Sequence, residues 1–209
     1  MKPSKSMRTQ IKICGLTKPE QALSCFNMGA DLIGLNCWSE SSRYIIPEII
    51  SEIVSELPKS AKTVGVFVNA SPDSINNLMK LTGMDLVQLH GDEDLLTCEK
   101  LDFPWFKAFR VSPKFKFSLI KHYKQEIFLI DAYSKYHFGS SGLKVDIDLA
   151  SKASGLGKMI LAGGLTIENV EEAVEKVKPW GVDVCSGVES KPGIKDMNLV
   201  EKFISKIVR

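Results

Sequence analysis

Short apolar runs alternate with helical patterns along almost the whole chain, and this alternation restricts the fold more than any single motif. Runs rich in Val, Ile, Leu and Phe are typical of buried strands, and the segments between them have the period of helices. Strands that alternate with helices usually pair in parallel, which indicates the α/β class. The eight predicted strands are residues 11–14, 32–35, 63–68, 86–89, 105–109, 127–131, 159–162 and 182–185.

Three of the intervening segments match the helical spacing i, i+3, i+4, i+7, in which apolar side chains share one face. Each set predicts a helix that packs one apolar stripe against the sheet. The sets are Ile50, Ile53, Val54 and Leu57; Val170, Ala173, Val174 and Val177; and Val200, Phe203, Ile204 and Ile207.

Local signals mark where helices begin and end. Thr17 followed by Glu20 predicts a capping box, and Ser71 before Pro72 predicts a second helix start. Glycine adopts the left-handed conformation that ends many helices, so a Gly-x-Asp triplet before a strand predicts a recurring helix-to-strand connection. Such triplets occur at residues 29–31, 83–85 and 181–183.

Eight βα units predict a single (β/α)8 TIM barrel over residues 11–209, after a short disordered leader of residues 1–10. A length of 209 residues is near the lower limit for this fold. A doubly wound open sheet shares the alternation of strands and helices. No GxGxxG, GxxxxGKS or GxxxxGKT sequence follows a predicted strand, which counts against nucleotide-binding open sheets. The barrel is therefore the favoured fold.

Charge and composition exclude several classes of partner. The formal net charge is +2 with acids and bases interspersed, so no nucleic-acid-binding surface is indicated. No apolar run is long enough to cross a membrane, and the polar opening segment is unlike a secretory signal. The five cysteines are scattered without a CxxC spacing, which indicates reduced thiols, a cytoplasmic location and no zinc site. No other cluster has the spacing of metal ligands, so we expect no metal.

Polar residues end several predicted strands, where a barrel of this type has its active face. They are Cys14, Gln88, His90, Asp131, Asp183 and Ser186. Lys12 and Cys14 share one face of the first strand, because side chains alternate along a strand. Cys14 considered alone would more often be a packed thiol. Lys12 has two interpretations: its side chain reaches solvent, or it is a buried charge. A buried charge needs a partner, and Asp131 and Asp183 could pair with Lys12 and with Lys107 in the barrel mouth.

Glycine-rich turns follow the last two predicted strands. Gly163 and Gly164 come after the seventh strand, and Ser186 and Gly187 come after the eighth. Backbone N–H groups in such turns favour phosphate, and barrels commonly hold phosphate after strands seven and eight. The two turns together indicate a phosphorylated substrate.

Arg43 and His90 each have two interpretations. A guanidinium such as that of Arg43 can clamp a carboxylate or a phosphate, or it can be an ordinary surface charge. His90 can be an acid–base group or a hydrogen-bonded loop residue. The residues alone leave both pairs of alternatives open.

Six segments, taken in order along the chain, resemble the phosphoribosylanthranilate isomerase family, whose members are single (β/α)8 barrels. The resemblance extends from Lys12 to about Phe203. The segments are KICGLT (12–17), SSRYI (41–45), VGVFVN (64–69), QLHGDE (88–93), AGGLTIENV (162–170) and DVCSGVESKPGIKD (183–196).

The resemblance implies an Amadori rearrangement of N-(5'-phosphoribosyl)anthranilate to 1-(2-carboxyphenylamino)-1-deoxyribulose 5-phosphate in tryptophan biosynthesis, without cofactor or metal. It implies that Asp131 is the general acid, which must stay protonated, and that Cys14 is the general base, whose ionisation positive neighbours would favour. The residues that would bind the substrate are Lys12, Arg43, Gln88, His90 and Asp183. Its phosphate would be bound by Gly142, Gly163, Gly164, Ser186 and Gly187.

The chain departs from the family at two loops. Ser42 precedes Arg43 where a proline is usual, and Ser140 lies in a loop that usually has another glycine. A related histidine-pathway isomerase is an alternative function, although an aspartate would be expected there in place of Cys14. A non-catalytic phosphate-binding barrel is another alternative. The expected partner is a small phosphorylated sugar-amine, and the protein is expected to be a monomer or a homodimer.

Overall fold

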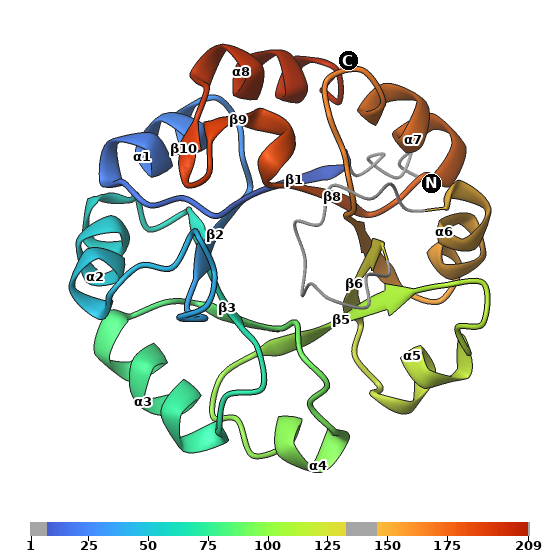
Figure 1. Cartoon of the computed structure of the whole chain (residues 1–209), viewed down its shortest axis with the longest axis horizontal. Helices are drawn as coiled ribbons and strands as arrows, with labels where there is room; N and C mark the ends of the chain where they lie inside the picture. The colour runs from blue at the N-terminus through green and yellow to red at the C-terminus, as the bar shows by residue number, and fades with distance from the viewer. Residues whose placement is uncertain (1–7, 133–145, 209) are drawn as a thin grey trace, which may run out of the picture.

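Eight parallel strands close into a barrel in the computed structural model, which describes residues 8–132 and 146–208 (Figure 1). The strands are β1 (Gln10–Cys14), β2 (Leu32–Asn36), β3 (Lys62–Phe67), β4 (Leu86–Leu89), β5 (Trp105–Val111), β6 (Ile127–Ala132), β7 (Lys158–Leu161) and β8 (Gly181–Val184). They follow one another around the ring in chain order, and β1 pairs with β8 with Lys12 opposite Asp183. Closure of the ring confirms the predicted barrel and rules out the open sheet.

The helices form a layer outside the ring of strands (Figure 1). Apolar residues from all three predicted stripes are buried in this layer, as Ile53, Val170 and Phe203 show. The helices are α1 (Pro19–Asn27), α2 (Pro47–Glu56), α3 (Pro72–Thr82), α4 (Leu95–Cys98), α5 (Ser118–His122), α6 (Ile147–Ser154), α7 (Val170–Val177) and α8 (Met197–Ser205).

All eight predicted strands are present, and their boundaries differ from the predicted ones by at most two residues. A short antiparallel hairpin after β8 was not predicted. It follows a 3-10 turn, η1 (Ser186–Val188), and consists of β9 (Glu189–Lys191) and β10 (Ile194–Lys195). Strands of this length contain too few residues to produce a recognisable alternation of apolar and polar side chains.

The barrel begins earlier than predicted. Arg8 donates two hydrogen bonds to the carboxylate of Asp31, at 3.0 and 2.6 Å, and Gln10 is already the first residue of β1. Residues 8–10 therefore belong to the folded chain and not to the predicted leader of residues 1–10. Residues 1–7 lie outside the described chain.

Side chains that alternate along the strands form two apolar clusters. The inner cluster fills the barrel with residues such as Val64, Phe106 and Leu129. The larger outer cluster packs the opposite faces of the strands against the helices. The inward rows end in polar residues at the carboxyl ends of the strands, and these residues form the candidate site.

Two of the three Gly-x-Asp triplets connect a helix to a strand as predicted. Gly29 and Gly83 have φ of 111° and 73°, and the aspartates that follow them accept hydrogen bonds from the first residues of the preceding strand. Asp85 Oδ2, for example, accepts from both the N–H and the hydroxyl of Thr63, at 2.9 and 2.8 Å. These carboxylates tie neighbouring strands together at the amino-terminal face of the barrel.

The third triplet was misinterpreted. Gly181 lies inside β8, and the left-handed residue that ends α7 is Lys178, with φ of 51°. Asp183 consequently does not join strands at the amino-terminal face; it points into the barrel and contacts Lys12.

The predicted capping box at Thr17 is also wrong, whereas the cap at Ser71 is confirmed. The Thr17 hydroxyl donates to the carbonyl of Gly193 at 2.5 Å, and the N-cap of α1 is Lys18, which makes no side-chain cap. Thr17 thus holds the hairpin after β8 against the loop after β1. Ser71 Oγ accepts from the Ser74 N–H at 3.2 Å.

Among residues 8–132 and 146–208, no helix has both the length and the apolar character needed to span a membrane.

Replacing Asp85 by alanine should lower the free energy of unfolding by about 1–3 kcal/mol, because the N–H and hydroxyl of Thr63 lose their acceptor. Urea unfolding followed by circular dichroism measures this change. Burial opposes ionisation of Asp85, but its hydrogen bonds with Thr63 and Lys62 outweigh it and lower the pKa. The contribution of Asp85 to the free energy of unfolding should therefore be present above about pH 4 and be lost as the pH falls further.

The control is Asp102→Ala, which removes only an exposed ion pair with Lys80. This substitution should lower the free energy of unfolding by about 0–1 kcal/mol. Equal effects of the two substitutions would show that Asp85 does not stabilise the barrel through its contacts with β3.

Candidate active site

A buried ion pair joins the first and last strands of the barrel. Lys12 Nζ lies 3.0 Å from Asp183 Oδ1, and Lys12 is 0% exposed. Burial favours the neutral amine, but the interactions of Lys12 with Asp183 and Cys14 outweigh burial and raise its pKa above the usual value. Of the two interpretations of Lys12, the structure therefore supports a buried cation paired with an acid.

Cys14, the next inward-facing residue of β1, is hydrogen-bonded to Cys185, which directly follows β8. This hydrogen bond and burial raise the pKa of Cys14 well above its usual value, and Lys12 opposes them without outweighing them. The hydrogen bond from Cys14 lowers the pKa of Cys185 to about 6; burial opposes this shift, and Lys195 and Arg43 support it. The first proton to leave belongs to the pair of thiols as a whole, so the expectation that Cys14 ionises readily stays a prediction.

The guanidinium of Arg43 is held by the carboxylate of Glu189. Arg43 Nε donates to the two carboxylate oxygens at 2.9 and 3.1 Å, and Nη2 donates to Oε2 at 2.7 Å. Lys195 Nζ donates to the same carboxylate at 2.8 Å and lies 3.8 Å from Cys185 Sγ. Burial would raise the pKa of Glu189, but Arg43 and Lys195 hold it below its usual range. Arg43 is thus a fixed cation beside the cysteine pair.

A second polar cluster lies at the ends of β4 and β6. Gln88 Nε2 lies 2.8 Å from His90 Nδ1, and His90 Nε2 lies 3.2 Å from Asp131 Oδ2. Asp131 Oδ1 accepts a hydrogen bond from the N–H of Ala132 at 2.7 Å. The His90–Asp131 contact has the distance but not the angle of a hydrogen bond, so within the described residues Gln88 Oε1 and His90 Nε2 lack a partner. Both atoms are buried and can bind a substrate.

The glycine turn after β7 passes close to Asp131. Gly163 and Gly164 have φ of 93° and 64°, a conformation that other residues rarely adopt. A Cβ at Gly163 would lie 2.8 Å from the backbone nitrogen of Ala132 and 3.0 Å from Asp131 Oδ1. Glycine at this position therefore allows the turn to approach the carboxyl group.

The turns after β7 and β8 pack against each other through their backbones. A Cβ at Gly187, next to Ser186, would collide with the carbonyl oxygen of Leu165. The structure thus brings together four of the five residues predicted to bind phosphate, whereas Gly142 lies outside the described residues.

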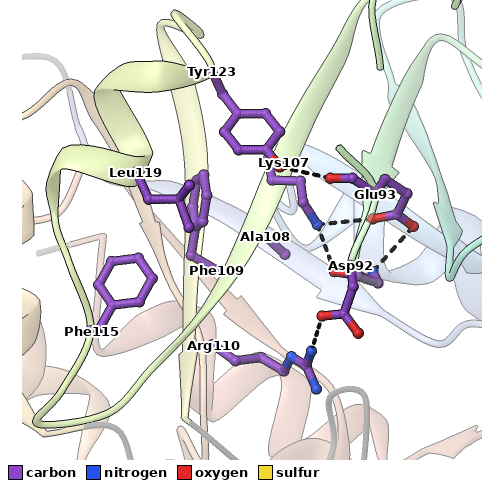
Figure 2. Close-up of a pocket in the computed structure, with 10 residues that line it drawn as sticks. Asp92, Glu93, Lys107, Ala108, Phe109, Arg110, Phe115, Leu119 and Tyr123 are labelled. Atoms are coloured by element: carbon purple, nitrogen blue, oxygen red, sulfur yellow. Dashed lines mark hydrogen bonds and ion pairs between the residues drawn. The ribbon is translucent and has the colours of Figure 1, made fainter. Parts of the chain in front are cut away.

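The prediction that Lys107 lies in the barrel mouth beside Asp131 or Asp183 is wrong. Its neighbours Phe106 and Ala108 belong to the inner cluster, so the lysine side chain points outward. Lys107 Nζ donates to Glu93 Oε2 at 2.8 Å and to the carbonyl of Gly91 at 2.7 Å (Figure 2). Lys107 is therefore a buried cation that holds the loop after β4.

Figure 2 shows the cavity beside this ion pair, between β5, α5 and the loop after β4. Phe109, Phe115 and Leu119 form its apolar side, and Arg110 forms an ion pair with Asp92 at its edge. None of the residues predicted to be catalytic lines this cavity.

Sequence reasoning missed three residues of the candidate site, namely Cys185, Glu189 and Lys195. All three lie in the segment DVCSGVESKPGIKD, and their contacts depend on the hairpin that this segment forms. The Pro192-Gly193 dipeptide was a signal for that hairpin, because it is a frequent turn sequence.

Within residues 8–132 and 146–208, no group of three or more His, Cys, Asp or Glu side chains could hold a metal ion. The chemistry that the described side chains offer is proton transfer, hydrogen bonding and charge pairing.

A family model described as N-(5'phosphoribosyl)anthranilate (PRA) isomerase matches residues 11–206. The match covers both polar clusters and both glycine turns. The chain belongs to the phosphoribosylanthranilate isomerase family. The family expected from the six sequence segments is thereby confirmed.

Individual phosphoribosylanthranilate isomerases agree with this assignment. The enzyme of Geobacter sulfurreducens is 45% identical over 197 residues, which cover 94% of this chain and 97% of the relative. The crystal structure from Thermotoga maritima has a TM-score of 0.89 and 36% identity, over 95% of this chain and 98% of that one. A phosphoribosylanthranilate isomerase structure in complex with reduced 1-(o-carboxyphenylamino)-1-deoxyribulose 5-phosphate has a TM-score of 0.85 and 35% identity, with the same coverage.

The substitution Asp183→Ala in this phosphoribosylanthranilate isomerase should lower the free energy of unfolding by about 3–5 kcal/mol, because it leaves the charge of Lys12 buried without its acid. The double variant Lys12→Met/Asp183→Ala should recover most of that loss, since it buries no charge. Urea unfolding of the single and double variants measures both effects. A double variant as unstable as Asp183→Ala would contradict the assignment of the loss to an unpaired charge.

Proposed function

We propose that the carboxyl-terminal mouth of the barrel is the active site, with Asp131 as general acid and Cys14 as general base. The reaction is the isomerisation of N-(5'-phosphoribosyl)anthranilate to 1-(2-carboxyphenylamino)-1-deoxyribulose 5-phosphate in tryptophan biosynthesis, which follows from family membership. The observation that best supports these roles is that a buried carboxyl group near the end of β6 and the buried thiol of Cys14 at the end of β1 lie at one barrel mouth.

In the first step, Asp131 donates a proton to the furanose ring oxygen, so that the ring opens to a Schiff base. Asp131 is only 4% exposed, and Gly163 brings the turn after β7 against it. His90 Nε2, at 3.2 Å from Asp131 Oδ2, limits the positions that the carboxyl group can adopt. Burial and close packing support this role because an acid catalyst must be oriented toward one atom.

In the second step, Cys14 removes the proton from C2' of the sugar, which gives an enolamine that tautomerises to the ketone. A thiolate is the basic form, and the Cys14–Cys185 pair carries one negative charge once a single proton has left it. Cys14 becomes the base when its own proton moves to Cys185. The ammonium of Lys12 supports this transfer, because it favours negative charge on Cys14.

The remaining polar residues hold the substrate. Arg43 is fixed by Glu189 through Nε and Nη2, and its remaining N–H groups bind the anthranilate carboxylate or a neighbouring polar group. Asp183 uses Oδ1 for Lys12, which leaves Oδ2 for a substrate hydrogen bond. Gln88 offers its buried Oε1, and His90 offers Nε2, which contacts Asp131 Oδ2 but makes no hydrogen bond among the described residues.

The substrate phosphate binds at the paired turns after β7 and β8. The N–H groups of Gly163 and Gly164 make no hydrogen bond within the part of the chain that the structure describes. Ser186 and Gly187 adjoin them through the contact of Gly187 with Leu165. Backbone N–H groups gathered in this way favour an anion.

These steps are proton transfers, so we propose that the reaction needs neither metal nor cofactor. A non-catalytic phosphate-binding barrel is the rival that the assay below tests directly. A monomeric or homodimeric state and a cytoplasmic location stay predictions.

The variants Cys14→Ala and Asp131→Asn should each lower kcat by about 10²–10⁴-fold, because each loses a proton-transfer group. The assay follows the loss of fluorescence of phosphoribosylanthranilate in the presence of a chelator, and circular dichroism checks folding. Cys25→Ala is the matched control, since Cys25 is a buried thiol of α1 outside the site. No turnover by the unaltered chain would refute the proposed function, and near-normal activity of Cys14→Ala would refute the assignment of the base.

The pH profile of kcat/KM should have its acidic limb near pH 6, which is the pKa of Cys185 within the pair. Below this pH both thiols are protonated and the base is lost, so the rate should fall as the pH falls. Cys185→Ser should move the limb to higher pH, because burial then raises the pKa of Cys14 more than Lys12 lowers it. Cys37→Ser is the control; a limb that stays in place in Cys185→Ser would belong to another group.

A further inference from the structure

Cys14 ends β1, and Cys185 directly follows its neighbour β8. The register of β1 and β8 places Lys12 opposite Asp183 and Ile13 opposite Val184, so the next positions are Cys14 and Cys185. Neighbouring strands lie about 4.7–4.9 Å apart. Disulfides span Cα separations of about 4.4–6.8 Å, so the backbone spacing suits a bridge between these residues.

The two thiols are close enough to influence each other. Each is the largest single influence on the pKa of the other, which places both side chains on the same side of the seam between β1 and β8. Glycines next to them leave the space that the sulfur atoms occupy: a Cβ at Gly15 would lie 2.9 Å from Cys185 Sγ, and a Cβ at Gly34 would lie 2.9 Å from Cys14 Sγ. The two sulfur atoms therefore occupy neighbouring space at the mouth of the barrel.

The cations around Cys185 favour its reactive form, and they outweigh the opposing carboxylate of Glu189, which lies 3.9 Å from Cys185 Sγ. Lys195 Nζ lies 3.8 Å from Cys185 Sγ, and the fixed guanidinium of Arg43 packs beside it. Together with the hydrogen bond from Cys14, these cations lower the pKa of Cys185 to about 6, so its thiolate predominates at neutral pH. Thiolates, not thiols, react with peroxides and disulfides.

The other cysteines have the opposite property. Burial raises the pKa of Cys25 and Cys98 to about 11 and that of Cys37 to about 12. These three thiols remain protonated at neutral pH, which makes the oxidation selective for Cys14 and Cys185.

We propose that Cys14 and Cys185 form a reversible disulfide when the protein meets a hydroperoxide, and that this bond switches the enzyme off. The loss of activity rests on the proposed role of Cys14 as base, whereas the bond itself does not.

The chemistry requires one peroxide molecule per bond. The Cys185 thiolate attacks one peroxide oxygen, the O–O bond breaks, and Cys185 becomes a sulfenic acid while the released hydroxide takes a proton. Cys14 then attacks the Cys185 sulfur, the S–S bond forms, and the leaving hydroxide takes the proton of the Cys14 thiol. Overall, two thiols lose two hydrogen atoms and hydrogen peroxide becomes two molecules of water. A dithiol reductant restores both thiols by exchange.

The test treats the purified full chain with hydrogen peroxide at neutral pH, then measures activity and maps peptides without reduction. We expect loss of activity, an intact mass lower by two hydrogen atoms, and a linked peptide that contains Cys14 and Cys185. Dithiothreitol should restore both the activity and the separate peptides.

Two variants, each normalised to its own untreated activity, make the test specific. Cys37→Ser should behave like the unaltered chain. Cys185→Ser should form no linked peptide, and inactivation by peroxide should be slower because the reactive thiolate is gone. Activity lost without the linked peptide, or equally fast inactivation of Cys185→Ser, would overturn the proposal. A linked peptide with full activity would support the bond and refute the role of Cys14 as base.

Discussion

The charge pair between Lys12 and Asp183 is the constraint on which the rest of the site depends. A buried ammonium without an acid carries a desolvation penalty of several kcal/mol, so the lysine must meet Asp183 across the seam where the barrel closes. A shift of one residue along that seam would turn every side chain of a strand to the other face. The pair thus fixes the register that brings Cys14 beside Cys185.

The charged side chains of Arg43, Glu189 and Lys195, which lie near the two thiols, are also held by ion pairs. Arg43 comes from the loop after β2, and Glu189 and Lys195 come from the hairpin after β8. The carboxylate of Glu189 holds both cations in place before any substrate arrives. Groups that are already oriented need not be rearranged during a reaction. The cost is that much of the binding capacity of Arg43 is used within the protein, which directs only its remaining N–H groups toward a ligand.

The barrel could be predicted from the sequence because the strands appear as short apolar runs and three of the helices show an apolar stripe at helical spacing. Single polar residues were harder to interpret. Lys12 and Lys107 look alike in sequence, since both are lysines within apolar strands, yet one faces inward to Asp183 and the other outward to Glu93. The sequence of a strand does not show which of its two rows of side chains faces the interior, because this depends on how the strands pair when the barrel closes.

Contacts between distant segments explain the rest of what the sequence did not reveal. Cys185 and Lys195 acquire their roles from a hairpin of very short strands, and Thr17 joins that hairpin instead of capping α1. Local patterns carry no information about such partners. The six segments that resemble the family located these residues without indicating what each one contacts.

The backbone contact between Gly187 and Leu165 limits how this barrel could be redesigned. Because any side chain at residue 187 would meet the carbonyl oxygen of Leu165, that position tolerates no diversity in a library aimed at new substrates. Ser186 has a side chain that can be exchanged, whereas the path of the main chain through both turns must be preserved. New specificity is therefore better sought at the opposite end of the ligand, where side chains rather than backbone form the wall.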